Sequence, residues 1–224
     1  MIVLTAILAN CPLERSSATA PSCTLALALA LDVSGSIDSG EYALQIEGLA
    51  AALRSQDVAD AIQSAGLVYM TVLHWSGSVQ QIQVVPWTRL RSASDIDDFA
   101  NRILSYPRQF DKFSTAIGEA LAFANAQFLE LPTPCRRRVI DVSGDGRSNE
   151  GWSPNLIRDQ VVRQGVTING LAVLANDDEL LAYFRRQVIG GAGSFVISAD
   201  QFEDYPSAMR RKLLREILPP IAVR

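Results

Sequence analysis

Residues 25–40 read LALALALDVSGSIDSG, an apolar strand pattern that runs directly into a polar loop. Seven alternating leucines and alanines run from Leu25 to Leu31 without a charge, and directly after them come Asp32, Ser34 and Ser36. A strand that is apolar on both faces is typical of the centre of a parallel sheet, where helices cover both sides. Its carboxyl end is the sheet edge at which open α/β folds bind ligands. The polar residues that follow the strand are therefore candidates for a binding site.

The rest of the chain alternates strand and helix patterns, which predicts an α/β fold with a mainly parallel sheet. We expect strands at 25–31, 67–75, 82–87, 139–142, 166–174 and 194–198. We expect helices at 38–53, 96–103, 117–131, 154–164, 178–188 and 206–218. The second and third strands flank a short turn at 76–78, which predicts a hairpin. These elements suffice for a doubly wound, six-stranded sheet with helices on both faces.

The composition predicts one globular domain, which we place at residues 21–224. The chain has 224 residues, of which 48% are hydrophobic, and this is enough to bury a full core. The net charge of -4 gives no electrostatic reason to expect a nucleic acid partner. We interpret the basic runs at 136–138 and 210–212 as solvated faces.

The first 20 residues are expected to form a signal peptide that directs the protein to the periplasm or the medium. Nine apolar residues are followed by small and polar ones, as in the apolar core and cleavage zone of such a signal. The segment Leu8–Cys11 also resembles a degenerate lipoprotein box. A retained strand or a disordered tail is the alternative interpretation. No other segment approaches the roughly 20 apolar residues of a membrane span, so none is expected.

Polar residues also follow other predicted strands at the same edge of the sheet. Besides Asp32, Ser34 and Ser36, the sequence has Thr115 at the head of the third helix and Asp145 after the fourth strand. Two carboxylates and three hydroxyls offer only hard oxygen donors, which suit Mg²⁺, Mn²⁺ or Ca²⁺ better than zinc or copper. The sequence therefore predicts a divalent cation site with these five residues as its ligands.

This pattern resembles the metal-ion-dependent adhesion site (MIDAS) of the von Willebrand factor A family. The resemblance rests on Asp-x-Ser-x-Ser at 32–36, the later Thr115 and the Asp-Gly at 145–146, and it covers residues 24 to about 218. It implies that Ser34, Ser36 and Thr115 bind the ion directly, and that the two aspartates bind it directly or through water. It also implies that the first and fourth strands are neighbours and that the hairpin strand is antiparallel at one edge.

Two stretches depart from the usual pattern of the family, and others are similar to one branch of it. The usual glycine-rich approach to the threonine is here Asp111–Thr115, and Ser143-Gly144 replaces the usual threonine before Asp-Gly. The paired stretches DVSGS and DVSGDG, the strand end HWSG at 74–77 and the C-terminal RRKLLREI are similar to an exported bacterial branch of this superfamily that has no assigned function.

The cysteines offer a separate test of the strand order that the resemblance implies. Cys23 lies nine residues before Asp32, and Cys135 lies ten before Asp145. If the two strands are parallel neighbours with level aspartates, both cysteines lie at the opposite end, with the one-residue offset absorbed where the strands begin. Neighbouring strands are about 4.8 Å apart, within the range of a disulfide. We therefore expect a Cys23–Cys135 disulfide, with two buried free thiols as the alternative.

The sequence offers little support for an enzyme. The only histidine, His74, lies at a strand end, where a packed or rim residue is the commoner role. No Gly-x-Ser-x-Gly motif is present, so a serine hydrolase is unsupported. We expect no catalysis.

The resemblance implies instead an exported module whose cation recognises a carboxylate on a partner protein. Two alternatives stay open. The protein could be an intracellular adaptor for an ATPase assembly, or its oxygen cluster could have only a structural role.

Overall fold

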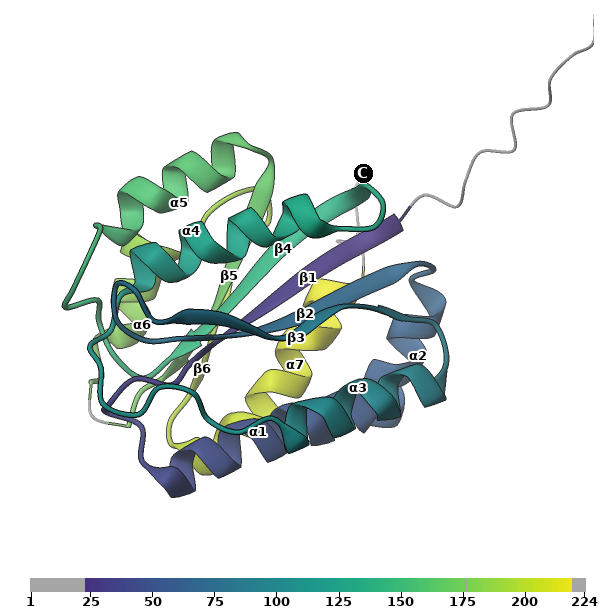
Figure 1. Cartoon of the computed structure of the whole chain (residues 1–224), viewed down its shortest axis with the longest axis horizontal. Coiled ribbons are helices and arrows are strands. Elements are labelled where there is room, and N and C mark those ends of the chain that lie inside the picture. The colour runs from purple at the N-terminus through teal and green to yellow at the C-terminus, as the bar shows by residue number, and fades with distance from the viewer. Residues whose placement is uncertain (1–22, 176, 219–224) are drawn as a thin grey trace, which may run out of the picture.

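The computed structural model describes residues 23–175 and 177–218, and its six strands form one sheet. The strand order is β3-β2-β1-β4-β5-β6 (Figure 1). Five strands run parallel, and β3 pairs antiparallel with β2 at one edge. The predicted fold class, the neighbouring first and fourth strands and the antiparallel edge strand are confirmed. The strands are β1 Cys23–Asp32, β2 Val68–Trp75, β3 Gln81–Leu90, β4 Cys135–Gly144, β5 Val166–Val173 and β6 Val196–Ala199.

Helices cover both faces of this sheet (Figure 1). One face carries α1 Ser39–Arg54, α2 Gln56–Ser64, α3 Ala93–Ser105 and α7 Tyr205–Ile217. The other carries α4 Ile117–Gln127, α5 Pro154–Arg163 and α6 Leu180–Tyr183. The sheet is thus the middle layer of three.

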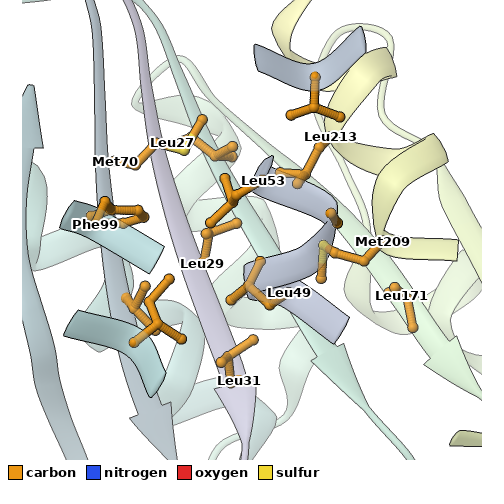
Figure 2. Packing of buried hydrophobic residues seen from close by; sticks show 14 of the residues in the cluster. Leu27, Leu29, Leu31, Leu49, Leu53, Met70, Phe99, Leu171, Met209 and Leu213 are labelled. Atoms are coloured by element: carbon orange, nitrogen blue, oxygen red, sulfur yellow. The ribbon is translucent and has the colours of Figure 1, made fainter. Parts of the chain in front are cut away.

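The alternation in β1 divides the interior into two cores. Side chains of a strand point to opposite faces in turn, so the four leucines of β1 face α1, α3 and α7. Figure 2 shows Leu27, Leu29 and Leu31 in this core, beside Leu49 of α1 and Met209 of α7. The three alanines at 26, 28 and 30 face α4 and α5 instead. Because all seven residues are at most 1% exposed, β1 is buried on both faces, as predicted.

The register between β1 and β4 aligns their first residues. Cys23 pairs with Cys135, and Leu31 pairs with Ser143. The two cysteines form a disulfide with their Cα atoms 4.3 Å apart, which confirms the predicted bond. The prediction that the one-residue offset lies where the strands begin is wrong. The strands start level, so Asp145 lies one residue beyond the position beside Asp32.

Several elements differ from their predicted bounds. Helix α2 was not predicted; its buried Val58, Ala61 and Ile62 follow helical spacing, and the extended backbone of Ser55 separates it from α1. Strand β4 is longer than 139–142 because its early arginines still pair with β1 and β5. The helix expected at 178–188 is α6 followed by a π-helical turn, Phe184–Val188.

The interpretation of the basic runs as solvated faces is wrong for two residues. Lys212 is fully buried, because the helical period of α7 turns it toward the sheet while Arg210 and Arg211 stay exposed. Arg137 is partly buried, and its guanidinium donates hydrogen bonds to the carbonyls of Glu216 and Ile217 at the end of α7. Arg137 therefore satisfies carbonyls that the helix end leaves without partners.

The predicted signal peptide at residues 1–20 lies outside the described residues. Within 23–175 and 177–218, no helix has both the length and the apolar character needed to cross a membrane.

Removal of the disulfide is expected to destabilise the fold. Cys23 and Cys135 are 112 residues apart, and closing a loop of this size is worth about 4–5 kcal/mol in the chain-entropy model. We expect Cys23→Ser/Cys135→Ser to lower the free energy of unfolding by a few kcal/mol in urea titrations. Dithiothreitol should lower the stability of the parent protein and leave that of the double variant unchanged. Equal effects of dithiothreitol on both proteins would contradict a stabilising disulfide.

Candidate functional site

The candidate site lies where β1 ends. Asp32 is the last residue of the strand and is fully buried. Its Oδ1 accepts a hydrogen bond from the backbone N–H of Ser34 at 2.8 Å, and its carbonyl accepts one from the Gln45 side chain of α1. Asp38 then caps α1 in the predicted capping box with Glu41. The loop between β1 and α1 is thus held at both ends.

Three loops bring the five predicted ligands together. Ser34 Oγ lies 3.3 Å from Ser36 Oγ and 3.3 Å from Thr115 Oγ1. Ser36 Oγ donates a hydrogen bond to Asp145 Oδ1 at 2.9 Å. We call Asp32, Ser34, Ser36, Thr115 and Asp145 the oxygen cluster. It extends from the buried Asp32 to the exposed Ser36, so one side of it is open to solvent.

Backbone contacts fix the loop that carries Thr115. The N–H of Gly35 donates to the carbonyl of Phe113, and the N–H of Ala116 donates to the carbonyl of Ser76. Thr115 and Asn149 are joined by two hydrogen bonds, from Thr115 N–H to Asn149 Oδ1 and from Asn149 N–H to the Thr115 carbonyl. The absence of the family's usual glycines before Thr115 therefore does not prevent this residue from reaching the cluster.

The two carboxylates of the oxygen cluster lack sufficient partners. Asp32 Oδ2 is buried and has no hydrogen-bond partner among the described residues. Burial, and after it the nearby Asp145, raise the pKa of Asp32 to about 7. Burial also raises the pKa of Asp145. Both shifts mean that the ionised carboxylates are poorly solvated where they lie.

Gly144 gives the unpartnered oxygen its room. A Cβ atom at this position would lie 2.9 Å from Asp32 Oδ2 and 3.4 Å from Asp32 Cβ. The replacement of the family's usual threonine by Ser143-Gly144 therefore leaves space around the carboxylate at the end of β1.

Arg108 is a site residue that the sequence did not identify. Its guanidinium donates hydrogen bonds to the carbonyls of Val33, Ser34 and Phe110, at 3.0, 2.8 and 3.1 Å. It joins the loop before Thr115 to the loop after β1. Its charge also favours the ionised forms of Asp32 and Asp145. A single arginine within the polar stretch 106–114 carries no sequence signal for this role.

The remaining polar residues near the site are held by other contacts. Arg147 pairs with Asp177 and Glu179, and the side chain of Glu150 accepts a hydrogen bond from Ser78. His74 is 1% exposed and lies edge-on to the rings of Tyr42 and Tyr106. Burial lowers its pKa to about 4. His74 is thus a packed residue, as its position in the sequence predicted.

The donor set fits a hard divalent cation. All five side chains offer oxygen, and the orphaned Asp32 Oδ2 is a buried anion for which a cation would be the natural partner. Among the described residues no group of three or more His, Cys, Asp or Glu side chains could hold a metal, so no competing site of that kind is present. The assignment of the five ligands stays a prediction.

Solved structures share this fold. Proximal thread matrix protein 1 from the mussel byssus is 15% identical over 88% of this chain, with a TM-score of 0.61. A von Willebrand factor type A protein from Catenulispora acidiphila is 14% identical over 88% of this chain, with a TM-score of 0.57. BatB from Bacteroides thetaiotaomicron is 16% identical over 86% of this chain and 98% of its own, with a TM-score of 0.55.

These similarities establish a von Willebrand factor A-like fold. The chain spans 49% of the mussel chain and 43% of the Catenulispora chain. Another structure of the mussel protein has a zinc-occupied MIDAS motif. No curated protein matches the sequence. Residues 22–221 match the family described as "Protein of unknown function (DUF1194)", and the chain belongs to this family.

Proposed function

We propose that this protein is an exported binding module that holds a divalent cation in the oxygen cluster and uses it to bind an acidic group of a partner. The observation that carries the proposal is the convergence of five oxygen-bearing side chains from three loops around a buried, unpartnered carboxylate oxygen. Mg²⁺, Mn²⁺ and Ca²⁺ are the ions that such donors prefer.

The composition of the cluster supports recognition of an anion. Asp32 and Asp145 formally balance the charge of a divalent ion, and the three hydroxyls are neutral. These five donors leave at least one position of a six-coordinate ion open to a further oxygen ligand. Ser36 is exposed and Asp145 is partly exposed, which leaves the ion reachable from solvent. A carboxylate from a partner protein would complete the coordination of the ion. The ion would supply the positive charge that the five side chains of the cluster lack.

Binding is favoured over catalysis by the surroundings of the cluster. The only histidine of the sequence is packed between Tyr42 and Tyr106, and Arg108 donates its hydrogen bonds to backbone carbonyls. Neither side chain is placed as an acid or base toward the ion. We therefore propose that the protein is not an enzyme.

The disulfide supports export to the periplasm or the medium. Disulfides persist mainly in oxidising compartments, and the Cys23–Cys135 bond joins the first residues of two central strands. This observation disfavours the intracellular adaptor for an ATPase assembly. A MIDAS motif that holds metal in the mussel protein supports the proposed ion site.

Divalent cations are expected to stabilise the protein through the oxygen cluster. Binding to the native state alone adds about 2.7 kcal/mol when the free ion is at 100 times its dissociation constant. Thermal melts in EDTA and in Mg²⁺, Mn²⁺, Ca²⁺ or Zn²⁺ should show a higher Tm with ion, and Asp145→Ala should remove this gain. Asp111→Ala, which removes an exposed carboxylate from the nearby loop, is the control and should keep it. An unchanged gain in Asp145→Ala would show that the site is wrongly assigned.

Without ion, Asp32 is expected to cost folding stability. Its folded pKa is about 7, against 3.8 in the unfolded chain, so the folded state binds more protons between these values and its stability falls as pH rises through this range. Each pKa unit corresponds to about 1.4 kcal/mol, which sets an upper limit of about 4 kcal/mol.

Asp32→Asn removes that buried charge. In EDTA at pH 8 we expect the variant to need more urea for unfolding than the parent protein, and at pH 4 the difference should shrink. The variant should also lose the stabilisation by Mg²⁺. A parent protein whose stability in EDTA rises between pH 4 and 7 relative to the variant would contradict the unpartnered state of this carboxylate.

Partner binding is expected to require both the ion and an accessible carboxylate. In a pull-down from an exported fraction, partner proteins should be retained in Mg²⁺ and released by EDTA, and Asp145→Ala should not capture them. Acetate at high concentration should compete, because it offers the same ligand group. Proteins captured equally in all of these conditions would contradict recognition through the cation.

A further inference from the structure

A second charged cluster is buried between β4 and α7, away from the oxygen cluster. Lys212 is 0% exposed, and Asp141 and Glu216 are each 1% exposed. Lys212 and Glu216 lie one helical turn apart on α7, and both face the sheet. Asp141 belongs to β4 and lies four residues before Asp145. One amine is therefore enclosed with two carboxyl groups in the protein interior.

The amine is in contact with both carboxyl groups. Lys212 Nζ lies 2.5 Å from Asp141 Oδ1 and 2.7 Å from Glu216 Oε1. It donates a hydrogen bond to Glu216, but its contact with Asp141 is not aligned as a hydrogen bond, and neither oxygen of Asp141 has a hydrogen-bond partner among the described residues. The amine thus lies in contact with Asp141 Oδ1, an oxygen bonded to the carboxyl carbon.

The surroundings hold this arrangement, in which all three side chains are at most 1% exposed. The side-chain amide of Asn169 donates a hydrogen bond to Glu216 Oε1 at 2.9 Å, while its oxygen accepts one from the N–H of Phe195. The ring of Phe195 lies 5.8 Å from Lys212 Nζ. Ion pairs gain little in such surroundings, because the loss of hydration offsets their attraction. Burial, and after it the neighbouring Asp141, raise the pKa of Glu216 to about 7.

We propose that Lys212 and Asp141 form an intramolecular amide bond, with Glu216 as the catalytic acid and base. The reaction needs the neutral amine and the protonated Asp141, which form when one proton moves from Lys212 to the carboxyl group that it contacts. The amine nitrogen attacks the carboxyl carbon, and Glu216 takes a proton from this nitrogen. Glu216 then returns the proton to a hydroxyl of the tetrahedral intermediate, and one water leaves. No oxidant, cofactor or further reactant is needed.

The contact between the amine and the carboxyl group accelerates amide formation. Two groups held in contact react as if at very high effective concentration, and a positioned acid and base adds about 10²–10⁴-fold. Glu216 and Asn169 also form part of the wall of a surface pocket, which gives the released water a short way out. The product would join the central strand β4 covalently to α7.

Peptide mapping tests this bond directly. Trypsin cleavage of the denatured full chain releases Val139–Arg147, which contains Asp141. It releases Lys212–Arg215 as one peptide only when the Lys212 amine is blocked, because trypsin also cleaves after a free lysine. We expect these peptides to be found joined, with a mass lower by one water than the sum of the two. Recovery of unlinked Val139–Arg147 at full yield, together with Leu213–Arg215 from cleavage after a free Lys212, would overturn the proposal. A link from Lys212 to Asn169, formed with loss of ammonia, would overturn the assignment to Asp141.

Two variants separate the reaction from a simple ion pair. Lys212→Arg keeps the positive charge and removes the nucleophile, so its intact mass should exceed that of the parent by the substitution plus one water. Because both chains share the same N-terminus, this difference does not depend on where the chain is processed. Glu216→Gln should form the bond at a rate at least about 100-fold lower than the parent protein. Freshly made variant protein should therefore show the intact mass of the unlinked chain. A linked Glu216→Gln protein that forms at the parent rate would overturn the role of Glu216.

Discussion

The parallel pairing of β1 with β4 is the constraint on which both ends of the molecule depend. These strands are the two central ones of the sheet, and their register starts with Cys23 beside Cys135. At the carboxyl end the same register leaves Asp32 next to Gly144, where no side chain blocks its second oxygen. A shift of one residue would turn every side chain of a strand to the other face. The disulfide, the carboxylates and the division into a leucine core and an alanine core are therefore consequences of one alignment.

The two ends of this strand pair have opposite energetic roles. At the carboxyl end, two carboxylates are collected with too few partners, and their raised pKa values show that the folded protein holds their charge at a cost. At the amino end, the disulfide restricts the unfolded chain and so favours folding. The stability gained from the disulfide can thus offset the free-energy cost of the buried carboxylates at the other end. A bound cation would remove that cost.

The sequence predicted the features that depend on short-range patterns. The uninterrupted alternation in β1 and the strand–helix pattern predicted the parallel sheet, and the family resemblance implied that the first and fourth strands are neighbours. The polar residues after two strands and Thr115 at the head of a helix gave the five residues of the oxygen cluster, which the structure brings together. Arg108 could not be predicted, because its role depends on carbonyls some 75 positions away in the chain. Lys212 was misread for a related reason. Its neighbours Arg210 and Arg211 are exposed, and only the packing of α7 shows that the third basic residue faces inward.

The contact between Arg137 and the end of α7 also shows where the two ends of the described domain lie relative to the oxygen cluster. Arg137 donates hydrogen bonds to the carbonyls of Glu216 and Ile217, and Thr24 and Ile217 line one small pocket. Residues 23 and 218 therefore lie at the same pole of the sheet, opposite the oxygen cluster. Any anchor or neighbouring domain joined to the chain at these points would be attached at the rear of the molecule. The oxygen cluster would then face away from the point of attachment, toward the surrounding solution.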